Sequence, residues 1–294
     1  MLASCAQHFT VLGRYRYGGE VLILLPPSEG KTSPTAGPRF SLESISFPEL
    51  TDARSRVVHA LQALGDNAEA AATLGLGKKS AEEASLNLSL FDSPCARVID
   101  LYTGVLYDHL DTATLDEESR GRLGRQALIS SALFGLIRPD DLIPNHRLSI
   151  GVRLPEIGAL GPWWRRQIER ASSDELDLWG RAVFDARSGG YKAAFSVGSA
   201  DVVELSVVEE RVAGRKVITH MAKKWRGLAA RHLVQDSSLT ESSTAGEILG
   251  SLGHMALASQ GLGVVGLEVS EPRPTKGGGS VVGATLVTTS TEKT

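Results

Sequence analysis

The sequence is poor in cysteine and in long hydrophobic runs, and each scarcity excludes a class of protein. Its 294 residues include two cysteines, Cys5 and Cys95, which form no CxxC pair and cannot build a disulfide framework. That usage predicts a reducing, cytoplasmic compartment. No apolar run reaches the roughly 18–20 residues of a membrane-spanning helix, and the first twenty residues lack the continuous apolar stretch of a secretion signal. Membrane, collagen-like and disulfide-rich classes are therefore excluded.

Recognisable metal and hydrolase motifs are also missing. The seven histidines lack ligand spacing such as HExxH, and the two cysteines lie too far apart in sequence for a zinc motif. No GxSxG nucleophile elbow occurs. We therefore identify no metal site and no cofactor from the sequence.

Charge is nearly balanced overall, with a formal net charge of −3, but it is unevenly distributed. Lys and Arg occur without any acid between residues 211 and 235, and six arginines face only Asp140 and Asp141 between residues 120 and 153. Such asymmetry describes either a solvated face or an anion-binding face.

The hydrophobic pattern predicts an α/β (α+β) fold: one compact domain over residues 20–294, preceded by a loose leader over 1–19. The aliphatic run VLILL at 21–25 is typical of a strand buried on both faces. Residues 128–136 fit either a strand or a short buried helix. We expect helices over 50–64, 68–74, 80–87, 101–110, 116–126, 162–170, 222–234 and 245–257. Further strands are expected over 176–184, 192–197 and 201–208, with a C-terminal β-hairpin from 264–269 and 281–288. Together these elements predict a mixed sheet.

The first segment with chemical potential is LGLGKKSA at 74–81, which has the spacing of a helix-hairpin-helix turn. Gly75 and Gly77 would let the backbone turn tightly, and Lys78 and Lys79 would stand beside the N-terminus of the second helix. Such hairpins bind nucleic-acid phosphates without reading sequence. The plainer alternative is a corner between two helices that needs glycine at a C-cap.

The second segment is PPSEGKT at 26–32, which follows the buried strand. It lacks the GxxxxGK spacing of a P-loop, yet loops after buried strands are where ligands bind in α/β sheets. Lys31 can neutralise a phosphate, Ser28 and Thr32 can donate hydrogen bonds, and Glu29 is the candidate catalytic base. A solvated loop is the alternative.

Three further segments offer polar groups to the same cleft. They contribute Tyr102 and Thr103 from YTG, Arg138, Asp141 and Arg147 from the central segment, and Ser188 and Tyr191 from DARSGGY. Arginine before proline adopts extended geometry suited to reaching an anion, whereas Asp141 could equally serve as a structural partner of an arginine.

The last segment is a basic helix at 222–234. Its cations Lys223, Lys224, Arg226 and Arg231 have no acid nearby in sequence, so we interpret them as anion-binding. The alternative is an ordinary solvated helix face.

In their order, these segments resemble the YaaA family of bacterial peroxide-stress proteins. The resemblance runs from Val21 to about Thr288 and is carried by VLILLPPSEGKT, LYTG, LFGLIRPDDLIPNHRLSIGVRL, PWW and AKKWRGLAARHL. The matching polar or turn residues are Lys31, Thr32, Tyr102, Thr103, Gly104, Arg138, Pro139, Asp141, Arg147, Arg153, Lys223, Lys224, Arg226 and Gly227. The chain departs from the family pattern in its longer first loop and at 185–191.

The resemblance implies a compact α/β fold with a helix-hairpin-helix and a positively charged cleft. It also implies protection against hydrogen peroxide, lowered free intracellular iron and binding of DNA. We therefore expect a monomeric cytoplasmic protein that binds duplex DNA independently of sequence. The residues themselves leave two alternatives open: an enzyme acting on a phosphate-bearing, nucleotide-like small molecule, and an iron-linked scaffold without a direct ligand.

Overall fold

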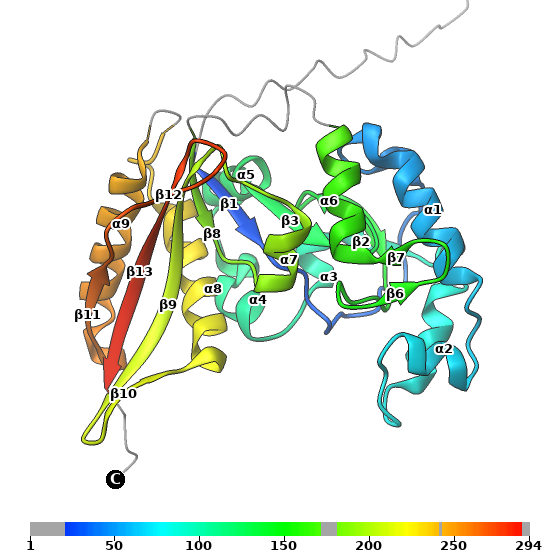
Figure 1. Ribbon diagram of the computed structural model, residues 1–294, viewed down its shortest axis with the longest axis horizontal. Coiled ribbons are helices and arrows are strands. Elements are labelled where there is room, and N and C mark those ends of the chain that lie inside the picture. Colours follow the sequence, from blue (N-terminus) through cyan, green and yellow to red (C-terminus); the bar gives the residue numbers. More distant parts are fainter. Residues whose placement is uncertain (1–20, 172–180, 241–242, 290–294) are drawn as a thin grey trace, which may run out of the picture.

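A mixed sheet runs through the protein, whose computed structural model describes residues 21–171, 181–240 and 243–289 (Figure 1). In spatial order its strands are β11 (Val264–Val269), β13 (Ser280–Thr289), β9 (Asp201–Arg211), β8 (Ala182–Asp185), β1 (Leu22–Leu25), β3 (Ala127–Ser131) and β4 (Gly135–Ile137). Two further strands extend its edges: β10 (Gly214–Val217) beside β9 and β12 (Arg273–Pro274) beside β13. Parallel pairing joins β3, β1, β8, β9 and β13, and the other pairs are antiparallel. The sheet is therefore mixed, as predicted.

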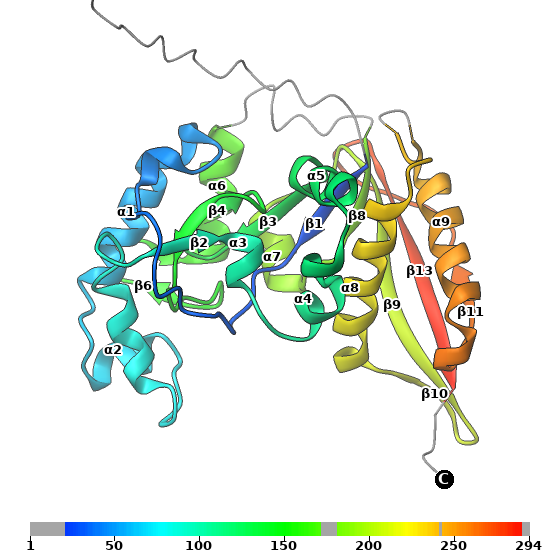
Figure 2. The same ribbon diagram turned by 180° about the vertical axis from the view of Figure 1, so that it is seen from behind.

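Helices cover both faces of the central strands. The α-helices of the described chain are α1 (Thr51–Gln62), α2 (Ala68–Thr73), α3 (Val98–Leu101), α4 (Val105–Leu110), α5 (Glu117–Gln126), α6 (Leu160–Arg170), α7 (Gly189–Ala194), α8 (Thr219–Gln235) and α9 (Ala245–Ala258). One face carries α4, α5, α8 and α9, and α7 lies against the other (Figures 1 and 2). Because β1 is covered on both sides, all four of its residues are buried, which explains its continuous aliphatic sequence.

Shorter elements complete the chain between these helices and strands. The 3₁₀ helices are η1 (Leu42–Ser44), η2 (Pro48–Leu50), η3 (Ala81–Asn87), η4 (Thr112–Thr114) and η6 (Gln260–Leu262). Two small antiparallel pairs are β2 (Cys95–Arg97) with β5 (Leu142–Pro144), and β6 (Arg153–Leu154) with β7 (Gly158–Ala159). They shape the region that leads from β4 to α6.

Side-chain caps define where several helices begin. The Asn67 side chain accepts hydrogen bonds from two backbone N–H groups at the start of α2, and Asp116 accepts one from Ser119 at the start of α5. Thr244 and Glu247 form a reciprocal capping box at α9. These bonds satisfy N–H groups that have no partner inside the helix, so the sequence specifies these starts locally.

The core extends from β1 to both ends of the sheet and includes a fully buried arginine on α1. Trp164 and Trp225 are fully buried, as is Arg54 on α1. The Arg54 guanidinium donates to the backbone carbonyls of Ser46, Phe47, Phe134 and Leu136. Burial lowers the pKa of Arg54 to about 10. This side chain ties α1 to β4 and to the segment that precedes η2.

The structure confirms a single compact α/β domain, a strand at 21–25 and a C-terminal antiparallel pair of β11 and β13. Segment 128–136 is a strand followed by a tight turn into β4, which resolves the alternative left open. The predicted leader lies outside the described residues, as do residues 176–180 of the predicted strand at 176–184.

Three sequence predictions are wrong in detail. The predicted helix 101–110 is interrupted, because Tyr102 is extended and Gly104 has φ +102° between α3 and α4. The predicted strand 192–197 is instead helical in its first half, within α7, because a short apolar run does not distinguish helix from strand. The predicted second helix of the hairpin, over 80–87, is the 3₁₀ helix η3, and the helix-hairpin-helix is not confirmed.

Candidate ligand-binding site at the carboxyl edge of the sheet

Three parallel strands, β1, β3 and β8, end at one edge of the sheet and position the candidate site. The chain proceeds from β1 to β3 on one side and returns to β8 on the other, so the strand order reverses at β1. Ligands bind at such reversal points in open α/β sheets, beyond the carboxyl ends of the strands. The loop 26–32 that follows β1 lies there.

Loop 26–32 is fastened to the YTG turn by backbone contacts. The Thr103 N–H donates to the Gly30 carbonyl at 3.0 Å, and the Thr32 N–H donates to the Leu101 carbonyl at 2.9 Å. An isolated β-bridge joins Lys31 to Tyr102. The Ser28 hydroxyl also donates to the Thr103 carbonyl. The structure therefore brings together Ser28, Lys31, Thr32, Tyr102 and Thr103, which the sequence analysis assigned to one cleft.

Lys31 is a half-buried cation whose ammonium lies 5.4 Å from the centre of the Tyr102 ring. Its Nζ donates to the Glu29 carbonyl at 3.5 Å, and it makes no ion pair within the described ranges. Burial, reinforced by the charge of Arg147, lowers the pKa of Lys31 to about 8. The fold thus places a partly desolvated amine at the mouth of the site.

A cluster of tyrosines lines the inner wall. Tyr102 and Tyr107 pack edge to face with ring centres 5.3 Å apart, and the Tyr107 hydroxyl donates to the Pro26 carbonyl at 2.7 Å. The Tyr102 hydroxyl is buried and interacts with the Ser131 side chain. Burial raises the pKa of Tyr102, and it raises that of Tyr191 on α7 to about 12. These hydroxyls stay protonated near neutral pH and serve as hydrogen-bonding groups.

Arg147 joins the cleft to the hairpin region. Its guanidinium lies 3.1 Å from a Glu29 carboxylate oxygen and 3.3 Å from one of Glu83. The Asn87 side chain fixes it by bonding both the N–H and the carbonyl of the Arg147 backbone, each at 2.9 Å. The Glu29 side chain, our candidate base, is 73% exposed. It is therefore an ion-paired carboxylate at the surface.

An open pocket of about 510 Å³ lies on this side of Arg147. Its wall is polar and includes a second arginine, the exposed Arg153. The remaining lining residues are Glu29, Thr73, Leu74, Gly75, Ser149, Gly151 and Val152. The hairpin and the cleft therefore share a boundary, which sequence reasoning did not anticipate.

The DARSGGY segment contributes mainly structural contacts. Arg187 forms a two-pronged ion pair with Asp185, with both N–O distances at 2.9 Å, and both side chains are buried. Arg187 also donates to the Phe195 carbonyl at 3.0 Å. It therefore holds α7 against β8 and is not a free donor. Ser188 is exposed, and Tyr191 is partly buried on α7.

Arg138 and Asp141 are not brought to this site. They follow β4, which runs antiparallel to β3 and leads away from the carboxyl edge. The Asp141 carboxylate accepts from the Arg138 N–H at 2.8 Å and from the Ser46 hydroxyl at 2.7 Å. The Arg138 guanidinium lies over the Phe47 ring. The structural interpretation of Asp141 fits these contacts.

The backbone conformation of the predicted hairpin explains why a glycine stands at position 75. Gly75 has φ +69°, and the bonds from its N–H to the Ala72 carbonyl and from the Leu76 N–H to the Ala71 carbonyl form a Schellman motif that ends α2. The plainer C-cap interpretation of Gly75 therefore matches its geometry. Gly77, Lys78 and Lys79 are exposed beyond it.

Two of the four predicted cations on α8 are engaged in packing. Arg226 donates to the Leu205 carbonyl at 3.2 Å, and Arg231 donates to the Leu110 and Asp111 carbonyls at 3.0 and 2.6 Å. Lys224 lies 5.5 Å from the centre of the Trp225 ring, and Lys223 is exposed.

The α8 cations also lie apart from the hairpin. Helix α8 is separated from α2 along the long axis of the molecule in both views (Figures 1 and 2). The predicted anion-binding residues thus form two groups, one on the hairpin and one on α8.

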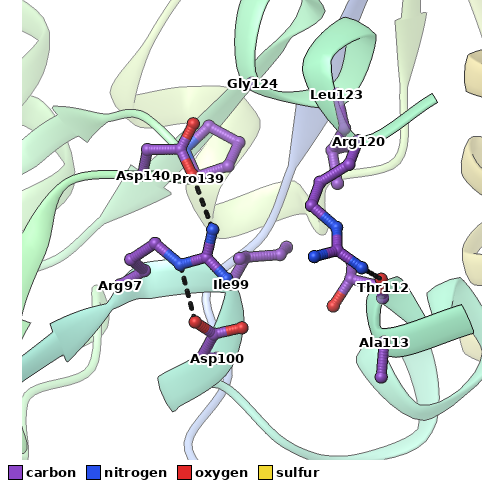
Figure 3. A pocket seen from close by; sticks show the side chains of 10 residues that line it. All are labelled: Arg97, Ile99, Asp100, Thr112, Ala113, Arg120, Leu123, Gly124, Pro139 and Asp140. Carbon is purple, nitrogen blue, oxygen red and sulfur yellow. Dashed lines mark hydrogen bonds and ion pairs between the residues drawn. The ribbon is translucent and has the colours of Figure 1, made fainter. Parts of the chain in front are cut away.

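A separate pocket of about 300 Å³ lies between α3, η4 and α5 (Figure 3). Arg97 in its wall is paired with Asp100 at 2.7 Å and with Asp140 at 3.5 Å. Arg120 points to the Thr112 carbonyl, at 3.4 Å. Both arginines are bound to acceptors of the protein itself.

Sequence reasoning missed three residues of the site, Glu83, Asn87 and His146. His146 is buried against Phe134, and burial with the nearby charge of Lys31 lowers its pKa to about 3, so its imidazole is neutral. All three act through long-range contacts, and no local pattern marks them. Within the described residues, no group of three or more His, Cys, Asp or Glu side chains could hold a metal ion, and no helix is long and apolar enough to cross a membrane.

Comparisons with known proteins give the chain's family. Residues 21–244 match the sequence family described as peroxide stress protein YaaA. A protein of Streptomyces coelicolor is 37% identical over 265 residues, covering 88% of this chain and 95% of its own. A Corynebacterium efficiens protein is 39% identical, covering 78% and 90% of the two chains, and one from Corynebacterium glutamicum is 41% identical, covering 72% and 84%. All three carry the family name UPF0246.

Proposed function

Because the chain belongs to the YaaA family of peroxide stress proteins, we propose that it protects against peroxide by binding a phosphate-bearing ligand at the carboxyl edge of β1. The observation that supports this proposal is Lys31, a partly buried ammonium without an ion pair among the described residues. A buried cation is stabilised when an anion neutralises it. The protein has only two cysteines and no disulfide framework, which suits action in the reducing cytoplasm.

Neighbouring groups support an anionic ligand at this position. Arg147 and Arg153 line the open pocket beside Glu29 and bring two guanidinium groups to this side of the site. A nucleotide-like small molecule suits this arrangement, because its phosphates would meet the cations and its base would meet the partly exposed Tyr191. This small-molecule ligand is the form of the proposal that the geometry favours.

A thermal-shift screen with pyrophosphate, nucleotides and dinucleotides tests it. A ligand at 100 times its Kd adds about 2.7 kcal/mol, which raises the Tm by at least about 4 °C. Lys31→Gln and Arg147→Gln should lose this shift, and Lys216→Gln, at an exposed lysine on β10, should keep it. The proposal fails if no compound stabilises the protein, or if Lys31→Gln responds as the wild type does.

Duplex DNA is the second candidate, and the observation that favours it is the exposed pair Lys78 and Lys79 beside the pocket of Arg147 and Arg153. Binding of this kind is independent of sequence and weakens steeply with salt, since it releases counterions. On α8 only Lys223 and Lys224 are available for a phosphate track, because Arg226 and Arg231 donate to backbone carbonyls.

Fluorescence anisotropy with a labelled duplex between 50 and 200 mM salt tests the DNA candidate. Removing two phosphate contacts with Lys78→Glu and Lys79→Glu should lower the slope of log K against log salt by about 1.8. Lys223→Glu with Lys224→Glu provides the matched change on α8. Unchanged binding in the hairpin variant would remove the hairpin from the interaction.

Turnover of a bound nucleotide-like ligand would make Glu29 the candidate base. Glu29→Gln preserves shape and removes the carboxylate, so it should retain binding and lose turnover of whichever compound the screen identifies. Unaltered turnover would exclude that role.

The proposed link to free iron is tested in cells that lack the gene. Wild-type protein should restore survival in hydrogen peroxide and lower chelatable iron, measured by electron paramagnetic resonance. Arg147→Gln should restore neither if the cleft carries the protective function. Restoration of both by this variant would separate the cleft from peroxide protection.

A further inference from the structure

The surroundings of Lys31 suit a second chemical role besides neutralising a bound anion. Its backbone is fixed by the β-bridge to Tyr102, and its side chain extends over the Tyr102 ring towards the Glu29 carbonyl. Glu29 is the acidic residue closest to Lys31 in sequence, but its carboxylate is paired with Arg147. The amine is therefore held in place without a carboxylate partner among the described residues.

We propose that Lys31 is a nucleophilic amine that forms an imine with an anionic carbonyl compound, an inference that rests on the ligand site proposed above. The ammonium form of Lys31 binds an anion, as proposed above, and only the neutral amine form can attack a carbonyl carbon. Here burial and Arg147 lower the pKa of Lys31 to about 8, so about a tenth of it is neutral at pH 7, far more than for an ordinary lysine.

Imine formation needs only the neutral amine of Lys31 and the carbonyl compound. The Lys31 nitrogen lone pair attacks the carbonyl carbon, and a proton moves from nitrogen to the former carbonyl oxygen. That oxygen then leaves as water with the second amine hydrogen, and a carbon–nitrogen double bond remains. No electrons are gained or lost. The Tyr102 ring lies 5.4 Å from the Lys31 ammonium and covers one side of it, so the carbonyl compound approaches the amine from the other side.

The anionic part of the compound is set by the arginines. Arg147 and Lys31 donate to the same Glu29 carbonyl, at 3.3 and 3.5 Å, and Arg153 shares the pocket beyond Arg147. A carbonyl compound that carries a carboxylate or a phosphate can therefore present its carbonyl carbon to Lys31 while its charge faces the guanidinium groups.

Reductive trapping tests the proposal on the full chain. Sodium cyanoborohydride with glyoxylate, with pyridoxal 5′-phosphate or with uncharged propionaldehyde converts an imine to a stable adduct, which peptide mass spectrometry locates. We expect Lys31 to be labelled at least 10-fold faster by either anionic probe than Lys216, the exposed reference lysine on β10. The two anionic probes distinguish a carboxylate from a phosphate ligand.

Variants and pH make the outcome specific. Lys31→Arg should lose the fast adduct and Lys216→Arg should keep it, and Arg147→Gln should reduce the preference for anionic over uncharged aldehyde. The rate at Lys31 should rise about 15-fold between pH 6.5 and 8, following the neutral fraction for a pKa of about 8. Labelling of Lys31 no faster than that of Lys216 would overturn the proposal. If pyrophosphate still stabilised the protein, anion binding would stand and only the nucleophile would be lost.

Discussion

Cys95 lies on β2 with 3% of its surface exposed, and burial raises its thiol pKa to about 11. Peroxide attacks the thiolate, and a pKa two units above the ordinary value of 9.0 lowers the thiolate fraction about 100-fold. We expect native Cys95 to react with hydrogen peroxide at least about 100-fold more slowly than in the urea-unfolded chain. Quenched-reaction mass spectrometry measures both rates. Equal rates would mean that the thiol is accessible and able to act as a sensor.

Lys31 also affects stability, with a defined dependence on pH. Its folded pKa of about 8 lies below the unfolded value of 10.5, so the unfolded chain binds more protons between these values. The folded state is therefore penalised below pH 8, and the penalty disappears as the pH rises to 10.5. Lys31→Met should raise the free energy of unfolding at pH 7 by up to about 3 kcal/mol. Urea titrations at pH 7 and 10.5 should show the gain only at the lower pH.

The contact between helices α4 and α8 depends on Gly227. A Cβ added there would lie 2.2 Å from the Leu106 carbonyl oxygen and 3.1 Å from the His109 Cβ. Gly227→Ala should push the helices apart and lower stability by about 2–4 kcal/mol. Gly250→Ala on α9 is the matched control, because its Cβ meets nothing within 4 Å. That control should be neutral or stabilise by up to about 1 kcal/mol, and thermal unfolding of both variants compares them.

Substitutions at Gly75, in the turn after α2, distinguish a conformational role of this residue from an anion-binding role. Its Cβ would meet no atom within 4 Å, so Gly75→Ala is disfavoured only by the left-handed backbone, at about 1–2 kcal/mol. Asparagine tolerates this conformation, and Gly75→Asn should recover most of the loss. Chemical denaturation measures both. Loss of anion binding in Gly75→Asn without loss of stability would contradict a purely conformational role.

Local patterns in the sequence predicted the elements that short-range physics determines. The aliphatic run of β1, the acidic start of α5 and the alternation of β11 and β13 each carry their own signal. The failures occur where distant contacts decide. Arg187 fixes a helix in α7 through the Phe195 carbonyl, and the bridge from Lys31 to Tyr102 interrupts the helix expected at 101–110.

The candidate site was predicted in the same uneven way. The loop after β1 was correctly joined to Tyr102 and Thr103, because a buried strand and its following loop are visible in sequence. Arg138 was placed in the cleft because no local pattern shows that β4 runs away from the carboxyl edge. His146 carried no signal, since its neighbours Phe134 and Lys31 are distant in the chain.

At the scale of the whole molecule, the family match ends before the fold does. It covers residues 21–244, whereas α9, β11, β12 and β13 follow, and β13 lies inside the sheet between β9 and β11. A chain ending at residue 244 would expose the full edge of β9. We expect this truncated chain to aggregate, as measured by sedimentation of freshly expressed protein. A soluble product with a cooperative thermal transition would contradict this expectation.

The pairing of β9 with β13 also sets a timetable for folding in the cell. Asp201 pairs with Ser280, so 79 residues must be made after β9 begins before its partner begins. At roughly 5–20 residues per second, this delay lasts about 4–16 s. During that interval the nascent chain presents an unsatisfied strand edge with alternating apolar side chains, the kind of surface that chaperones recognise. The last strand translated therefore closes the edge on which the solubility of the nascent chain depends.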